Sequence, residues 1–266
     1  MFTPRQSFCH STFLAAAILA ASPSLHAGAH KPASDQVASD TGPDSDVSID
    51  SAQLAIIDIG DMVALSGRYE TAIKIYAKSP RKTAEIWNKM GMSYEMMFNT
   101  SEAIRCYIES LKLNPNDPSV LNNLATLYES KKEYGAADRY FEKALSVDPQ
   151  FAAIYKNLGT SLIAQHRYAE GQKAYEQALA LDPSVFDVRD NPTLGSSGST
   201  HERGAMNYFM ALACARMGQI ERALDYLRMS LNQGFVDPRQ VAADAGFAPL
   251  SADPGFKKLL AEEGGQ

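Results

Sequence analysis

The chain has 266 residues, of which 45% are hydrophobic, and a formal net charge of −6 at pH 7. Its lysines and arginines do not cluster, and phosphate binding needs a basic footprint, so the charge pattern argues against nucleic acid as a partner. The length is ample for one elongated domain beyond the N-terminal segments.

The first residues follow the order of a secretory signal peptide. Arg5 precedes an apolar run of nine residues, Phe13 to Ala21, and the small residues Ala27-Gly28-Ala29 come soon after. Nine residues are too few to span a bilayer. We therefore expect residues 1–29 to be a signal peptide cleaved after Ala27 or Ala29. The mature chain is then periplasmic or secreted, and no later run is apolar for long enough to cross a membrane.

Residues 30–51 are rich in Ala, Ser, Pro, Gly and Asp and contain almost no aliphatic side chains. Such a segment cannot bury enough apolar surface to offset its chain entropy. It is predicted to be a disordered acidic linker.

A period of 34 residues governs the centre of the chain, dividing 84–185 into the units 84–117, 118–151 and 152–185. A fixed period of this size is typical of stacked repeats, because one unit cannot bury its apolar face alone. Each unit repeats a bulky residue, an apolar residue followed by a small one, an aromatic and a proline. These residues are Trp87, Leu121 and Tyr155; Met90, Leu124 and Leu158; Gly91, Ala125 and Gly159; Tyr107, Phe141 and Tyr175; and Pro115, Pro149 and Pro183.

This pattern resembles the tetratricopeptide repeat. The resemblance implies an all-α fold, a right-handed superhelical solenoid of antiparallel helix pairs, and a role in binding proteins. Asp117 before Pro118 is a good start for a first helix, and Thr100 or Ser101 is expected to cap a second helix. The small residues of the first helices are expected to let the two backbones of a pair approach closely.

Degenerate units flank the three clear ones. Residues 52–83 fit an N-terminal repeat whose second helix is cut short at Ser79-Pro80, and residues 204–234 fit a last repeat. Residues 186–203, dense in Gly and Ser, are predicted to be a flexible insertion. Residues 235–266 are predicted to cap the solenoid, with Phe256, Leu259 and Leu260 on the last repeat.

Few residues are suited to chemistry. His166 and His201 lack the spacing of a zinc site, and no catalytic or phosphate-binding motif occurs, so we expect neither an enzyme nor a cofactor. Cys106 and Cys214 lie on repeats too far apart to pair, which favours buried free thiols.

The tetratricopeptide resemblance implies that the first helix of each repeat lines a concave groove for a protein or peptide partner. The predicted groove residues are Asn88, Lys89, Met92, Met96, Asn122, Asn123, Thr126, Lys156, Asn157 and Thr160. Glu95 and Glu129 occupy further positions of the same rows. Asn123 and Asn157 are expected to stand in a row, where side-chain amides offer donors and acceptors to a peptide backbone. An exposed helix face that simply tolerates asparagine fits the sequence equally well.

We therefore expect a non-catalytic interaction scaffold in the bacterial envelope. One alternative is a structural adaptor that self-associates and leaves the groove unused. Another is a copper carrier, because Met92 and Met96 lie one helical turn apart and thioethers suit Cu(I). Methionine more commonly provides adaptable apolar surface, so packing or partner contact is the favoured interpretation of this pair.

Overall fold

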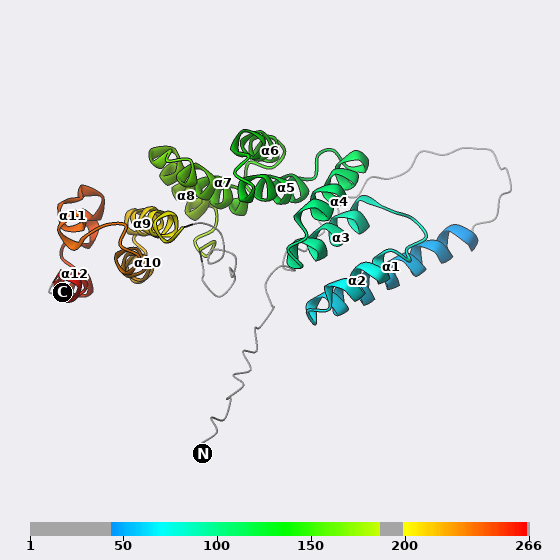
Figure 1. Cartoon of the computed structure of the whole chain (residues 1–266), viewed down its shortest axis with the longest axis horizontal. Helices are drawn as coiled ribbons and strands as arrows, with labels where there is room; N and C mark the ends of the chain where they lie inside the picture. The colour runs from blue at the N-terminus through cyan, green and yellow to red at the C-terminus, as the bar shows by residue number, and fades with distance from the viewer. Residues whose placement is uncertain (1–43, 187–198, 265–266) are drawn as a thin grey trace, which may run out of the picture. The chain divides into compact units, whose positions relative to one another are not determined.

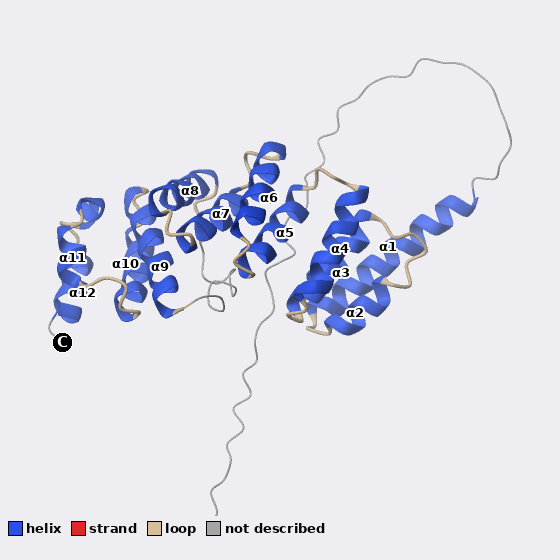
Figure 2. Ribbon diagram, turned by 45° about the horizontal axis from the view of Figure 1, so that its top comes forward, coloured by secondary structure: helices blue, strands red, loops and turns tan. Residues whose placement is uncertain are grey.

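The computed structural model describes residues 44–186 and 199–264, with only the backbone described for 44–50, and every regular element in these ranges is helical (Figures 1 and 2). The helices pair in chain order, α1 with α2 through α9 with α10, which confirms an all-α fold of antiparallel helix pairs. The elements are α1 (Asp44–Leu65), α2 (Tyr69–Tyr76), α3 (Ala84–Met96), α4 (Thr100–Leu113), α5 (Pro118–Ser130), α6 (Tyr134–Val147), α7 (Ala152–Ala164), α8 (Tyr168–Leu181), α9 (Thr200–Arg216), α10 (Ile220–Asn232), α11 (Pro238–Ala243), the 3-10 helix η3 (Ala245–Leu250) and α12 (Pro254–Gly264).

The chain divides into two compact units, one ending at Lys82 and the other beginning at Thr83. The first unit holds the α1–α2 pair. In the second unit the second helix of each repeat also packs on the first helix of the next, α4 on α5, α6 on α7 and α8 on α9. The first helices α5, α7 and α9 are neighbours in turn, so they contribute to one continuous face.

Local signals fix where the helices begin. Asp117 accepts hydrogen bonds from the backbone N–H groups of Ser119 and Val120, so α5 starts at Pro118 as predicted. The cap of α4 was predicted one residue too late, because Asn99 rather than Thr100 or Ser101 accepts from a backbone N–H of the first turn. Asparagine also suits this position, since its short side chain reaches the N3 amide.

The turn between the two helices of each repeat has one residue in the left-handed region. These residues are Gly67, Phe98, Lys132, His166 and Gly218, with φ between 57° and 77°. Because the same turn recurs, these residues show which positions of the five helix pairs correspond in sequence. Three of the five are not glycine, so these turns carry local backbone strain.

Small residues on the first helices, which were predicted to let the two backbones approach closely, lie against an aromatic ring of the second helix. A Cβ added to Gly91 would lie 2.6 Å from Tyr107 Cε1, and one on Gly159 would lie 2.5 Å from Tyr175 Cδ1. Both distances are shorter than any ordinary carbon contact. Only glycine therefore permits this packing.

Three segment boundaries differ from the prediction. Helix α1 begins at Asp44, inside the segment predicted as linker, where aspartates suit the positive end of a helix dipole. Helix α9 begins at Thr200 rather than after residue 203, because Ser199 and Glu202 form a capping box. Phe186 was assigned to the flexible insertion and is in fact core. The predicted signal peptide, residues 30–43 of the linker and residues 187–198 of the insertion lie outside the described residues.

Phe186 is 1% exposed and packs edge-on against Tyr175 and Tyr226, at centroid distances of 5.1 and 6.4 Å. The Tyr226 hydroxyl donates a hydrogen bond to the backbone carbonyl of Phe186 at 2.6 Å. The Gly and Ser content of the segment as a whole concealed this one aromatic residue, which joins the third repeat to the last.

After α10 the chain folds back onto the last repeat. η3 packs on α9 and α12 packs on α10. Five apolar side chains of this segment are buried in one cluster with α9 and α10: Val241, Phe247, Leu250, Phe256 and Leu259. Leu260 packs against the cluster half-buried. No described helix is both long and apolar enough to cross a membrane.

Both described cysteines are buried and free, which confirms the expectation. Burial raises the pKa of the Cys106 thiol to about 11 and that of Cys214 to about 12. Neither is therefore a nucleophile at neutral pH.

Candidate partner-binding face

The residues predicted to line the groove lie on α3, α5 and α7, the first helices of the three clear repeats, and we call this surface the first-helix face. Asn88, Lys89, Met92 and Met96 come from α3; Asn122, Asn123 and Thr126 from α5; Lys156, Asn157 and Thr160 from α7. Most of these side chains are half-buried. Asn122 is an exception at 8% exposed, and Met96 is one at 38%.

Asparagine amides connect α7 to α5. Asn157 Nδ2 donates to Asn122 Oδ1 at 3.0 Å, and Asn122 Nδ2 lies 3.5 Å from Asn123 Oδ1. The link between the repeats therefore runs through Asn122, not directly between Asn123 and Asn157, which the 34-residue spacing had suggested. Because the side-chain oxygen of Asn122 already accepts from Asn157, the role of Asn122 is to position Asn157 and Asn123.

The polar chain continues from α5 to the α3–α4 pair. Asn123 of α5 lies near the Tyr107 hydroxyl and lowers the pKa of Tyr107, and that hydroxyl donates to Glu95 Oε2 at 2.7 Å. Burial raises the pKa of the Glu95 carboxyl, and the bond from Tyr107 opposes that rise. Burial and the neighbouring Glu95 carboxylate raise the pKa of Tyr107 well above its ordinary value. Tyr107 thus stays protonated and remains a donor.

Tyrosine hydroxyls of the second helices recur as partners of first-helix side chains. Tyr76 donates to Asp61 Oδ1 at 2.6 Å in the first unit, and Tyr175 shares a 2.9 Å hydrogen bond with Thr160 in the third clear repeat. The sequence analysis predicted none of these hydroxyl contacts. The available signal was the choice of Tyr over Phe, since Phe141 at the same position has no hydroxyl and makes no such bond.

Asn88 on α3 presents an unsatisfied acceptor. Its Oδ1 atom is buried, and no donor among the described residues hydrogen-bonds it. Leaving a buried acceptor unpaired costs about 1–3 kcal/mol. A bound peptide N–H would remove that cost once the half-buried side chain turned this oxygen towards the surface. On the same helix, Lys89 Nζ lies 3.8 Å from Glu85 Oε1 and its side chain is only 15% exposed.

The two methionines proposed as an alternative copper site differ in environment. Met92 packs against the apolar cluster that contains Val120 and Leu124, whereas Met96 is exposed. Packing therefore accounts for Met92. Within the described ranges, no group of three or more His, Cys, Asp or Glu side chains could hold a metal ion.

The first-helix face ends at α7, because the last repeat has different residues in the same positions. Aligning Gly218 with His166 places Tyr208, Phe209 and Leu212 where α7 has Lys156, Asn157 and Thr160. The Tyr208 hydroxyl donates to Asp244 and its ring packs 5.6 Å from that of Phe247. Leu212 is 4% exposed and lies under Gly246, so the C-terminal segment covers these positions.

An ion pair crosses from the second clear repeat to the start of α9. Lys132 Nζ lies 3.5 Å from Glu202 Oε1. Burial raises the pKa of nearby Glu129, and the Glu202 charge adds to that rise while Lys132 lowers it. These three residues give the face a charged edge beside α5.

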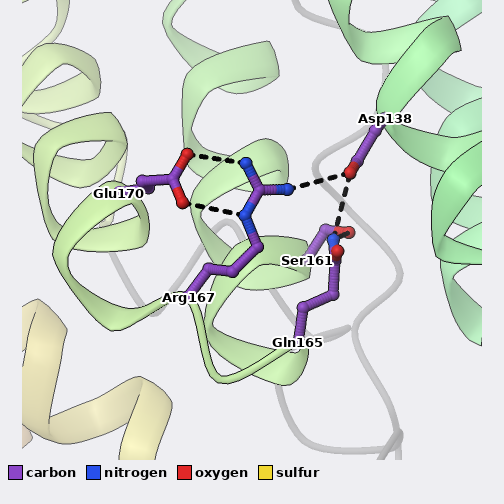
Figure 3. A network of polar contacts seen from close by, with 5 residues as sticks. All are labelled: Asp138, Ser161, Gln165, Arg167 and Glu170. Carbon is purple, nitrogen blue, oxygen red and sulfur yellow. Dashed lines mark hydrogen bonds and ion pairs between the residues drawn. The ribbon is translucent and has the colours of Figure 1, made fainter.

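A second polar network fixes the third clear repeat on the repeat before it (Figure 3). Arg167 binds both carboxylate oxygens of Glu170 at 2.9 and 2.6 Å and reaches Asp138 Oδ2 at 3.0 Å. Gln165 Nε2 donates to Asp138 Oδ1 at 3.0 Å and lies 3.3 Å from Ser161 Oγ. The network joins α6, α7 and α8.

Comparison with known proteins identifies the repeats. Residues 82–150 and residues 152–185 match two tetratricopeptide repeat family models. This stretch is therefore similar to tetratricopeptide repeats, and the class of fold is a helical repeat of antiparallel pairs. No curated protein sequence matches the chain.

Solved structures share the fold. The chain is similar to PilF of Pseudomonas aeruginosa, with a TM-score of 0.54 and 17% identity over 82% of this chain and 90% of that one. Two MamA structures give TM-scores of 0.48 and 0.46, at 18% and 19% identity. They cover 73% and 70% of this chain and 97% and 98% of theirs. At 17% identity, the similarity to PilF concerns the fold alone.

Proposed function

We propose that the chain is a non-catalytic protein–protein interaction scaffold whose first-helix face binds an extended segment or helix of a partner protein. The similarity to tetratricopeptide repeats supports the general role. The signal-peptide-like N-terminal sequence supports a periplasmic or secreted setting in a bacterial envelope.

The observation that carries the proposal is the unsatisfied Asn88 acceptor beside the polar chain on α3, α5 and α7. Asn157 donates to Asn122 and Tyr107 donates to Glu95, so these side chains are already held in place and little side-chain entropy is lost when a partner binds. Amides bind main-chain groups whatever the partner's sequence. The partner's backbone would supply the N–H group that Asn88 Oδ1 lacks.

The replacement Asn88→Leu tests the face, because it separates stability from binding. Leucine removes the unpaired buried acceptor at similar volume, so the free chain is expected to unfold at the same or a higher urea concentration. Binding of the partner is expected to weaken at least tenfold, since the acceptor is gone. The partner is first isolated from an envelope extract on the immobilised chain, then purified and titrated directly by calorimetry.

Gln177→Leu is the matched control, because Gln177 is exposed on the second helix α8, away from the face. It is expected to leave the affinity unchanged. If the purified partner binds Asn88→Leu and the wild type equally, the first-helix face is not the binding site. Fractionation of cells expressing the full chain checks the setting separately, and recovery from the cytoplasm alone would contradict export.

A further inference from the structure

Helix α1 presents a second apolar side, which α2 does not cover. Leu54 is 62% exposed, Ile59 50%, Met62 70% and Leu65 49%. The opposite side of the helix, with Ile57 and Gly60, is buried. The four exposed residues fall on one side at helical spacing, and we call them the open α1 face.

The repeat register shows what this face is. Aligning Gly67 of the first turn with the left-handed residues of the later turns places Ile59 and Met62 at positions that the other repeats bury. The equivalents of Ile59 are Met90, Leu124 and Met210, all buried, and Leu158, half-buried; those of Met62 are Ser93, Leu127, Ser161 and Ala213, all buried. The part of the open α1 face formed by Ile59 and Met62 therefore corresponds to the surface on which a preceding repeat would pack.

The chain itself shows what kind of element covers these positions. On α5 the equivalents of Ile59 and Met62, which are Leu124 and Leu127, lie in a cluster with side chains of the preceding repeat. Three of those side chains, Ile104, Ile108 and Leu111, belong to α4 and follow an i, i+4, i+7 spacing. A helix with such a stripe is thus the complement of the open α1 face.

The charge of α1 further limits which helix can bind the open α1 face. The sequence of α1 has five aspartates and neither lysine nor arginine, and Asp58 is exposed between the apolar residues of the face. Two copies of α1 packed together would place like charges against each other in a partly dehydrated contact, which is unfavourable. Head-to-tail stacking of copies is also blocked, because the C-terminal segment already covers α9 and α10.

We propose that the open α1 face binds an amphipathic helix of a partner protein, with an Ile/Leu stripe spaced i, i+4, i+7 and lysine or arginine beside it to pair with Asp58. This surface lies on a different helix from the first-helix face and adds a second binding function to the scaffold.

Two synthetic helices test the proposal against the full chain. The first has the sequence of α4, residues 100–113, with Cys106→Ser and blocked ends; it carries the Ile104, Ile108 and Leu111 stripe and no net charge. The second adds Glu102→Lys and Glu109→Lys, which place positive charge beside the stripe. By fluorescence anisotropy, the basic helix is expected to bind the full chain at least tenfold more tightly than the neutral one.

Variants of the chain locate the binding. The double variant Ile59→Glu, Met62→Glu is expected to weaken binding of the basic helix at least tenfold. Both residues are exposed, so folding is retained, which circular dichroism checks. Asp58→Asn is expected to reduce the preference for the basic helix over the neutral one. Leu113→Glu, at a residue 57% exposed on α4, is the matched control and leaves binding unchanged.

Three results would overturn the proposal: no binding of either helix, full binding to the double variant, or a wild-type dimer in sedimentation velocity that the double variant abolishes. The last result would make a second copy the occupant. The Asn88→Leu variant is expected to bind the basic helix as the wild type does. The proposals for the first-helix face and for the open α1 face are therefore tested separately.

Discussion

The two terminal repeats use the same helix position in opposite ways. Met210 on α9 is 1% exposed, whereas its equivalent Ile59 on α1 is 50% exposed. At the C-terminal end, η3 and α12 complete the core of the last repeat. At the N-terminal repeat, the described chain supplies no such element. The described residues thus cover this helix position in the last repeat and leave it exposed in the first.

Removing one aromatic side chain from the closed end tests how much that closure contributes. Phe247 is 2% exposed and packs against the rings of Tyr208 and Phe256. Phe247→Ala is expected to lower the free energy of unfolding by about 3–5 kcal/mol, because it leaves a cavity in the cluster that joins η3 to α9. Urea unfolding followed by circular dichroism measures it.

Phe98→Ala is the control for this loss, because Phe98 is 87% exposed and is expected to change stability by no more than about 0.5 kcal/mol. Equal effects of the two replacements would mean that the C-terminal segment is not part of the folded core.

The same truncation at equivalent positions of the two terminal repeats tests the comparison directly. Met210→Ala is expected to cost about 2–5 kcal/mol, since the side chain is fully packed. Ile59→Ala is expected to change the free energy of unfolding by no more than about 0.5 kcal/mol. A large loss from Ile59→Ala in urea unfolding would show that the open α1 face is already covered in the free chain.

The first and last repeats also differ in the residues that meet where the two helices of a pair come closest. A Cβ on Gly60 would lie 2.2 Å from Tyr76 Cε1, whereas the last repeat has Ala211 and Leu227 in these positions. Gly60→Ala is therefore expected to destabilise the chain by about 1–3 kcal/mol through overpacking, despite the better helix propensity of alanine. Thermal unfolding measures the change.

A double replacement identifies the cause. Gly60→Ala combined with Tyr76→Leu reproduces the pair of the last repeat, so the combined loss is expected to be smaller than the sum of the two single losses. Additive losses, or a gain from Gly60→Ala alone, would contradict a steric origin.

The sequence was most informative where a feature of the fold depends on the size of a single side chain. The 34-residue period was enough to locate the helix pairs, and Gly91 and Gly159 marked where the helices of a pair come close; that each glycine lies against a tyrosine ring emerged only from the structure. Segment composition was less informative, because it averages over residues. The start of α1 at Asp44 and the buried Phe186 both lay inside segments whose average indicated a linker or a flexible loop.

The candidate site was predicted in position but not in connection. The sequence placed Asn122, Asn123 and Asn157 on one face, yet which amides bond depends on the rotation of α7 against α5. Asn157 therefore reaches Asn122 rather than the residue one period away. The hydroxyl of Tyr107 was missed for a similar reason: its ring fills the core, and only the packed structure shows its end beside Glu95.

The smallest expected effect concerns charge at the centre of the array. Helices α3 and α5 have Glu95 and Glu129 where α1 and α9 have Ala64 and Ala215. Burial raises the pKa of Glu95, so the folded chain keeps its proton to a higher pH than the unfolded chain does. The free energy of unfolding therefore falls as pH rises through the interval between the ordinary carboxyl pKa and the raised one.

The replacement Glu95→Gln removes this pH-dependent contribution, while the amide oxygen of the glutamine still accepts from Tyr107. Urea unfolding at several values between about pH 4 and pH 8 is expected to show a stability gain from Glu95→Gln that grows with pH. A gain that shrinks or reverses with pH would mean that the Tyr107 bond outweighs burial at this carboxylate.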